Sequence, residues 1–169
     1  MNATTKAPRH KEYVMFFLTY NFLTNNKKDL GALVIIKEQK MFKSLSDKEE
    51  KVAKQIVDAA FQVHKQLGPG FLEKVYEACF CYELSKRGIA FRQQVEVPIV
   101  YDQKSFDVGF RLDVLVEDLI ICELKAVEEM NPVFEAQIMS YLKMAKKRLG
   151  FLINFNVPII KNGIRRIIL

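Results

Sequence analysis

Residues 119–126, LIICELKA, combine a hydrophobic run with two charged side chains, Glu123 and Lys125. Residues two apart on a β-strand project from the same face of a sheet, so this carboxylate and ammonium are expected side by side. They could form a surface ion pair on a half-exposed strand, which contributes little to stability. They could also be the reactive groups of a site at the edge of the core.

The register of the hairpin formed by residues 105–118 and 118–126 decides which residue faces Glu123. A two-residue turn at 117–118 sets Glu123 opposite Leu112 in an apolar layer, where an unpaired charge costs several kcal/mol. A three-residue loop at 117–119 instead sets Asp113 opposite Glu123. The same loop gathers the apolar residues on one face: Leu112, Val114, Val116, Ile120, Cys122 and Leu124. Because the hydrophobic pattern specifies register, we predict the three-residue loop.

In this register the Asp113 and Glu123 side chains lie within about 5 Å of each other at Cβ. Two carboxylates so close repel each other unless a positive charge lies between them. A divalent cation would supply that charge, held by the two carboxylates and the backbone carbonyl of Leu124. Lys125 could then orient or deprotonate a water, or stabilise developing negative charge. These residue types point to chemistry on a phosphate group.

Helices are predicted on both sides of this hairpin. Ser46 and Glu49 form a capping-box pattern that opens a helix to about Leu67, where LGPG ends it. A second helix is expected over about 71–86, before Gly88. Asn131 and Pro132 open a third helix, which is expected to reach about Leu149.

The strands complete an α/β fold. Alternating or apolar runs bounded by turn residues predict the strands 91–101, 105–118, 118–126, 150–156 and 163–169. The resulting order is α-α-β-β-β-α-β-β, with antiparallel strands first and a helix crossover after them. We therefore expect a central mixed sheet flanked by helices, rather than a doubly wound fold.

The 169 residues fit one folded domain preceded by an extension. Residues 1–40 are rich in Asn and Lys and lack a clean period, which indicates an extension from a non-native upstream start or a peripheral arm. They hold seven Lys and Arg against three Asp and Glu, whereas residues 41–169 hold nineteen against seventeen. Most of the net charge of +6 thus lies outside the predicted domain, 41–169, and is a weak argument about its partners.

The composition also bears on zinc and membranes. Three cysteines without a CxxC pair and only two histidines argue against a zinc site and suit reduced thiols in the cytoplasm. The apolar run 13–23 is too short to cross a membrane. We expect a cytoplasmic protein that does not bind a membrane.

The arrangement of Asp113, Glu123 and Lys125 resembles the D-x9-E-x-K pattern of the PD-(D/E)XK nuclease superfamily. Leu112 stands where the name of the superfamily has Pro, a position that varies among its members. Gln137 and Tyr141 are similar to the QxxxY motif of the RecB-like branch, and they share one helix face at i and i+4.

A third motif lies in GPGFLEKVYE, where Gly70, Glu73 and Tyr76 resemble the GxxExxY signature of a small bacterial and archaeal family placed in the same superfamily. The resemblance covers about residue 46 to the C-terminus. It implies a restriction-endonuclease-like core that uses Mg²⁺ or Mn²⁺ to hydrolyse phosphodiester bonds.

The resemblance also implies roles for individual residues. Asp113 and Glu123 would ligate the metal, Lys125 would serve the attacking water, and Glu73 would complete the site from a helix. Gln137 and Tyr141 would support the substrate or the metal ligands.

Several of these residues have structural alternatives. Glu73 could only complement a helix dipole, and Glu77, one turn later, could replace it as a ligand. Tyr76 and Tyr141 could be core aromatics, and His64 could cap carbonyl groups at a helix end. Five basic residues suit a helix C-terminus or a closing strand, or could hold phosphates: Lys143, Lys146, Lys147, Arg165 and Arg166.

Two classes of function follow. The first is a metal-dependent nuclease that acts on DNA rather than RNA, and the intact Asp113, Glu123 and Lys125 favour it. The second is a catalytically silent module that binds nucleic acid or acts as an accessory interaction protein. The modest charge of residues 41–169 suits this module, or an enzyme that works with a protein partner or as a homodimer.

Overall fold

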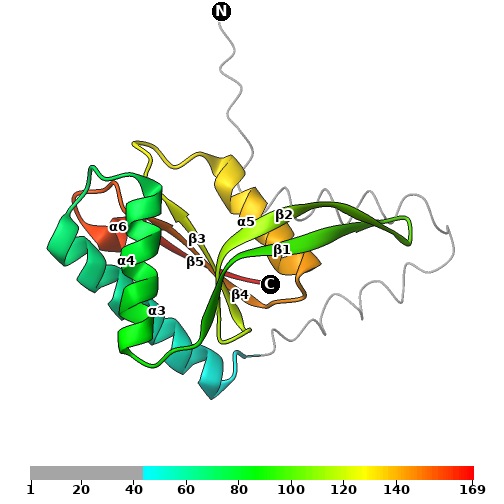
Figure 1. Ribbon diagram of the computed structural model, residues 1–169, viewed down its shortest axis with the longest axis horizontal. Coiled ribbons are helices and arrows are strands. Elements are labelled where there is room, and N and C mark those ends of the chain that lie inside the picture. Colours follow the sequence, from blue (N-terminus) through cyan, green and yellow to red (C-terminus); the bar gives the residue numbers. More distant parts are fainter. Residues whose placement is uncertain (1–43) are drawn as a thin grey trace, which may run out of the picture. The chain divides into compact units, whose positions relative to one another are not determined.

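A five-stranded mixed sheet forms the centre of the computed structural model (Figure 1), which describes residues 44–169 except the side chains of 107 and 108. The order across the sheet follows the chain: β1 (Phe91–Tyr101), β2 (Lys104–Val116), β3 (Ile120–Lys125), β4 (Leu149–Asn154) and β5 (Ile164–Ile168). Only β3 and β4 run parallel; the other neighbours are antiparallel. This confirms the predicted mixed sheet. The predicted extension, 1–40, lies outside the described residues.

Four helices surround the sheet in this part of the chain: α3 (Asp47–Leu67), α4 (Glu73–Lys86), α5 (Pro132–Met144) and the short α6 (Ile160–Gly163). The predicted capping box is present, because Ser46 Oγ accepts from the Glu49 N–H and the Glu49 carboxylate accepts from the Ser46 N–H. None of these helices combines the length and apolarity needed to span a membrane.

Helix α5 is shorter than predicted, and α6 was not predicted. Asn131 caps α5 as expected, since its side chain accepts from the Val133 N–H at 2.9 Å. The helix ends at Met144 instead of about Leu149 because Lys146 adopts a left-handed φ of 54°. The Lys147 N–H then donates back to the Leu142 carbonyl, as at many helix C-termini.

The two faces of the sheet bury separate cores. Ile120, Cys122 and Leu124 of β3 pack with side chains of α3 and α4, whereas Ile121 packs with Ile138 and Leu142 of α5. Figure 1 shows the corresponding layers, with α3 and α4 on one side of the strands and α5 on the other. Because residues alternate along a strand, the odd-numbered residues after Ile121 also face the α5 side.

The predicted register of β2 and β3 is confirmed. The paired residues are Val114 with Cys122, Leu115 with Ile121, and Val116 with Ile120. The loop between them has three residues, 117–119, and the Leu119 N–H donates to the Val116 carbonyl at 2.9 Å. This is the pairing expected from the hydrophobic pattern.

In the β1–β2 hairpin, the alternation of side chains between the two faces of the sheet is interrupted at Gln94 and Asp113. Leu112 and Leu115 contribute to the same core although they are three residues apart, so the alternation of β2 is broken between them. Opposite Asp113, Gln94 has a left-handed φ of 52°, and the register of the hairpin is the same on both sides of this point. The prediction that Leu112 shares a face with Val114 and Val116 is therefore wrong, because this kink turns Leu112 toward α5.

Tyr76 fixes the loop between α3 and α4. Its buried hydroxyl donates to the Gly68 carbonyl at 2.7 Å and accepts from the Phe71 N–H at 3.1 Å, and its ring stacks on Phe155. Gly70 has a φ of 103°, which side-chain-bearing residues rarely adopt. The loop therefore turns at Gly70 and is held by Tyr76, so that α4 begins at Glu73.

Removing the Tyr76 hydroxyl should destabilise the fold. Tyr76→Phe leaves the Gly68 carbonyl and the Phe71 N–H without their partner, and we expect the free energy of unfolding to fall by about 1–3 kcal/mol. Chemical denaturation measures this change, with Tyr82→Phe as the control because Tyr82 lies on the same helix and is exposed. Equal stability of the two variants would contradict the role given to Tyr76.

Candidate active site

Glu123 and Lys125 form a buried ion pair at the end of β3. The Lys125 Nζ lies 2.7 Å from Glu123 Oε1, and the two side chains are only 13 % and 4 % exposed, respectively. The Lys125 ammonium also lies 5.6 Å from the centre of the Phe134 ring of α5. The alternative of a solvent-exposed surface pair is thus excluded by the burial of both groups.

The kink in β2 brings Asp113 to this pair. The ladder between β2 and β3 stops at Val114 and Cys122, and beyond it an Asp113 carboxylate oxygen accepts from the Leu124 N–H at 2.9 Å. Asp113 also raises the pKa of Glu123 through charge repulsion. The two carboxylates are therefore neighbours, as the register predicted.

Helix α4 adds two more carboxylates. Glu73, its first residue, accepts from the Ala126 N–H and interacts electrostatically with Lys125 and Asp113. Glu77, one turn later, accepts from the side-chain amides of Gln93 and Gln94 at 3.0–3.2 Å. Glu73 therefore joins the site, while Glu77 ties α4 to the kinked strand.

Burial shapes the electrostatics of this group. It raises the pKa of Glu123 to about 7, together with the charge of Asp113 and against the opposing effect of Lys125. Burial likewise raises the pKa values of Asp113 and Glu73. For Lys125, burial acts to lower the pKa, but Glu123, Glu73 and Asp113 outweigh it and the pKa is raised. The lysine stays charged, whereas the carboxylates hold protons more tightly than usual.

One atom of these carboxylates, Glu123 Oε2, gives the main reason to expect a bound cation. Glu123 Oε2 is buried and has no hydrogen-bond partner in the described part of the chain. A proton, a bound water or a cation can satisfy a buried oxygen of this kind. Oxygen atoms of Asp113 and Glu123 and the Leu124 carbonyl are hard ligands suited to Mg²⁺, which keeps several waters. Within residues 44–169, however, no three His, Cys, Asp or Glu side chains are grouped so that they could hold a metal by themselves.

Asn154 positions the segment after Lys125 and was not identified from the sequence. Its buried side chain accepts from the Val127 and Asn156 N–H groups and donates to the Val127 carbonyl. The Phe155 N–H donates to the Lys125 carbonyl at 2.9 Å. The signal in the sequence was an Asn within the apolar run GFLINF, because a buried amide requires partners.

Gln137 and Tyr141 contact each other on α5. The Gln137 amide donates to the Tyr141 hydroxyl, and the Tyr141 ring stacks on Phe110 with centroids 4.2 Å apart. Tyr141 thus belongs to the core, which confirms its structural alternative. Gln137 lies three residues after Phe134, the ring beneath Lys125, so it shares that face of the helix. Support of a substrate by either residue stays a prediction.

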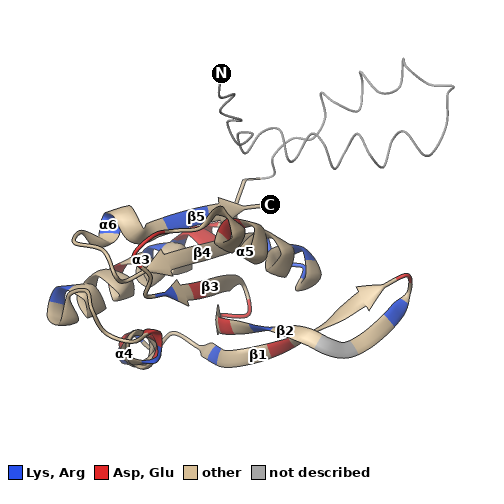
Figure 2. Cartoon of the chain, turned by 90° about the horizontal axis from the view of Figure 1, so that it is seen from above, with Lys and Arg blue, Asp and Glu red and all other residues tan. Residues whose placement is uncertain are grey.

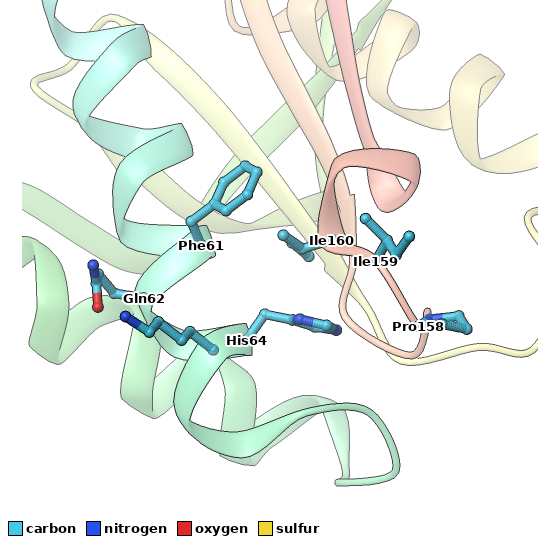
Figure 3. Close-up of a pocket in the computed structure, with 7 residues that line it drawn as sticks. Phe61, Gln62, His64, Pro158, Ile159 and Ile160 are labelled. Atoms are coloured by element: carbon cyan, nitrogen blue, oxygen red, sulfur yellow. The ribbon is translucent and has the colours of Figure 1, made fainter.

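His64 lies in a different environment (Figure 3). Its Nε2 is 2.7 Å from the Val157 carbonyl, so it joins α3 to the loop before α6. It also lines an open hollow with apolar neighbours that include Phe61, Ile159 and Ile160. These contacts give His64 a structural role outside the group of carboxylates.

The predicted phosphate-binding residues do not form one cluster at the site. Lys147 pairs with Asp118 at 3.0 Å, at the start of β3, and Arg166 pairs with Glu50 at 2.5 Å. The start of β3 lies about 16 Å from Lys125 along the strand. Lys143 and Lys146 precede Lys147 at the same end of α5.

Arg165 is placed differently. It is exposed on β5 and pairs with Leu152, which in turn pairs with Glu123. It therefore lies two strands from Glu123, about 10 Å at Cα, and on the same face of the sheet. Of the five basic residues, Arg165 is the one that this register brings toward the carboxylates.

Comparison with known proteins identifies the family of the chain. A family model described as the PD-(D/E)XK nuclease superfamily matches residues 50–167, well over half of the chain. Among curated proteins and among solved structures, no match was found. The matched range contains the acidic residues and the lysine at the end of β3, together with β1 to β4 and all but the last residue of β5. The chain belongs to the PD-(D/E)XK nuclease superfamily.

Proposed function

We propose that the protein is a Mg²⁺- or Mn²⁺-dependent nuclease that hydrolyses phosphodiester bonds, with DNA favoured over RNA. The observation that carries the proposal is Glu123 Oε2, a buried oxygen that has no hydrogen-bond partner among residues 44–169, in a side chain that interacts with both Lys125 and Asp113. Membership in the nuclease superfamily supports the reaction class.

The residues at the end of β3 and their neighbours would have separate roles in the reaction. Asp113, Glu123 and the Leu124 carbonyl would hold the cation, and Glu73 would close the site from α4. When bound, such a cation neutralises phosphate charge and lowers the pKa of a water. Lys125 would hold the attacking water or stabilise the charge that grows on the non-bridging oxygens. Arg165 would contact a neighbouring phosphate.

The finer family assignments also belong to this proposal. For the GxxExxY family, Tyr76 holds the loop that turns at Gly70, and this places Glu73 at the start of α4. For the RecB-like branch, Gln137 and Tyr141 form a hydrogen-bonded pair on α5. Each motif thus has a physical reason in this fold.

A silent binding or accessory module is the second candidate. It is favoured by the engagement of Lys125 with Glu123 and by the lack of a three-ligand group within residues 44–169. In the nuclease, a cation on Glu123 Oε2 would lie close to the Lys125 ammonium on Oε1 and would be repelled by it. The module has no such repulsion to overcome, whether it works as a homodimer or with an accessory protein.

Removing the Lys125 charge should separate the two candidates. Lys125→Met keeps the aliphatic stem beside Phe134 but removes the ammonium, and we expect cleavage of DNA to fall by ~10²-fold or more. Because the Glu123 pKa is already about 7, Glu123 can take up a proton near neutral pH and the fold should persist. Nuclease assays with Mg²⁺ or Mn²⁺ measure the loss, and circular dichroism checks the fold.

The control for this variant is Lys74→Met, a neutralised lysine that is exposed on the first turn of α4. It should cleave as the wild type does. Wild-type protein that binds DNA but cleaves neither single-stranded nor duplex DNA with either metal would decide for the silent module.

Magnesium should stabilise the folded protein, since binding to the native state alone raises stability by mass action. We expect millimolar Mg²⁺ or Mn²⁺ to raise the Tm of the wild type and to have little effect on Asp113→Asn. Asparagine keeps an acceptor for the Leu124 N–H, so the strand end should stay in place. Asp58→Asn, which changes an exposed aspartate of α3 in the same way, is the matched control and should respond as the wild type does. Equal responses of wild type and Asp113→Asn would exclude Asp113 as a ligand.

The metal-free protein should lose stability as the pH rises. The pKa of Glu123 is raised from 4.5 to about 7 in the folded state, so the native state binds more protons than the unfolded state between these values. The free energy of unfolding should therefore fall from about pH 4.5 to 7 and then level off, by roughly 3 kcal/mol at most. Denaturation in EDTA at several pH values tests this. Glu123→Gln should flatten the slope; an unchanged slope would assign it to other groups.

A further inference from the structure

The start of α4 carries an exposed apolar lip beside the candidate active site. The lip consists of Phe71, Leu72 and Val75, which are 47, 78 and 36 % exposed. Glu73 lies within it and accepts from the Ala126 N–H, next to Lys125. Figure 1 shows the loop before α4 close to the loop that follows β3. The lip and the carboxylates are therefore neighbours.

The aromatic member of the lip is held in place. The Phe71 N–H donates to the Tyr76 hydroxyl, and the Phe71 ring packs edge-on against the Tyr76 ring at 6.2 Å and 89°. Almost half of the Phe71 side chain nevertheless stays open to solvent. A fixed, open aromatic ring loses little conformational freedom when a flat ligand stacks on it.

Charges near the lip do not suit a DNA duplex. The loop after β3 carries two exposed carboxylates, Glu128 and Glu129, in addition to the acidic site. Figure 2 shows basic segments on β5 and at the end of α5, and Lys147 and Arg166 from these segments are engaged in ion pairs. A duplex-binding protein typically neutralises about 6–10 phosphates with Lys and Arg. Within residues 71–75 the lip carries one exposed lysine, Lys74, where a duplex would need a basic track.

We infer that the lip receives an unpaired nucleobase, stacked on Phe71, and that single-stranded nucleic acid is the substrate class of this site. The inference rests on the proposed function for the phosphodiester that Lys125 and the carboxylates would act on. Stacking of a base on an aromatic side chain is worth about 5- to 150-fold in affinity. A duplex keeps its bases inside the helix and would present only its backbone to the lip.

Binding of labelled oligonucleotides tests the inference without cleavage. We would compare single-stranded and duplex DNA of equal length by fluorescence anisotropy, using the full chain in Ca²⁺. The wild type should bind the single strand more tightly, with a logarithmic salt slope of about 1–2 instead of the steep slope of a duplex binder. Phe71→Ala should weaken single-strand binding about 10-fold and leave duplex binding unchanged.

Two further variants complete the test. Phe71→Trp keeps an aromatic face and should bind the single strand at least as well as the wild type, which separates stacking from a folding defect. Tyr101→Ala is the matched control, because Tyr101 is an aromatic residue 74 % exposed at the tip of the β1–β2 hairpin. It should bind as the wild type does.

The inference would be overturned by duplex binding as tight as single-strand binding, by no binding of either, or by a Phe71→Ala variant that binds as the wild type does. An equal loss in Tyr101→Ala would also overturn it. The proposed function fails separately: loss of binding in Phe71→Ala without cleavage by the wild type leaves the lip as the binding site of a silent module. If cleavage requires Lys125 but is unchanged in Phe71→Ala, only the inference about the lip is wrong.

Discussion

The burial of one carboxylate, Glu123, is the constraint that organises this protein. Removing a charged group from water costs several kcal/mol unless partners satisfy it. Lys125 satisfies one oxygen of Glu123 at 2.7 Å, and the other oxygen has no partner among the described residues. Asp113 adds a second negative charge beside it. A sequence selected for stability alone would place an apolar residue at this position, so the arrangement supports the proposal that a cation completes the site.

The fold supplies the constraint through three local features. The kink at Gln94 and Asp113 ends the regular ladder, so that the Asp113 side chain takes the Leu124 N–H in place of a backbone partner. The loop held by Tyr76 starts α4 at Glu73. Asn154 fixes the segment that follows Lys125. In each feature a polar group inside the protein positions a residue of the candidate site, and all three features lie near the end of β3.

Much of this could be predicted from the sequence because hydrophobic patterning determines register. A shift by one residue would have mixed Glu123 with Val114 and Val116 on one face of the sheet. The pairing that the structure has instead collects the apolar residues of both strands in one core: Val114, Val116, Ile120, Cys122 and Leu124. The kink could not be predicted, because it exchanges the faces that the side chains of both strands occupy while the register stays unchanged. Register also determines the positions of the basic residues on β5. Arg165 and Arg166 are adjacent in sequence, yet they pair with Leu152 and Phe151 and so face opposite sides of the sheet. Alternation along β5 separates them, but only the strand order relates them to Glu123.

The Glu123 carboxylate is buried without a full set of partners among the described residues, and we propose that a divalent cation completes it. A ¹³C NMR titration of the Glu123 side chain, with and without Mg²⁺, measures this directly. We expect a titration midpoint near pH 7 in the metal-free protein, in accord with the raised pKa, and a clear fall of that midpoint when Mg²⁺ is added. A midpoint near the ordinary value of 4.5 that Mg²⁺ leaves unchanged would contradict it.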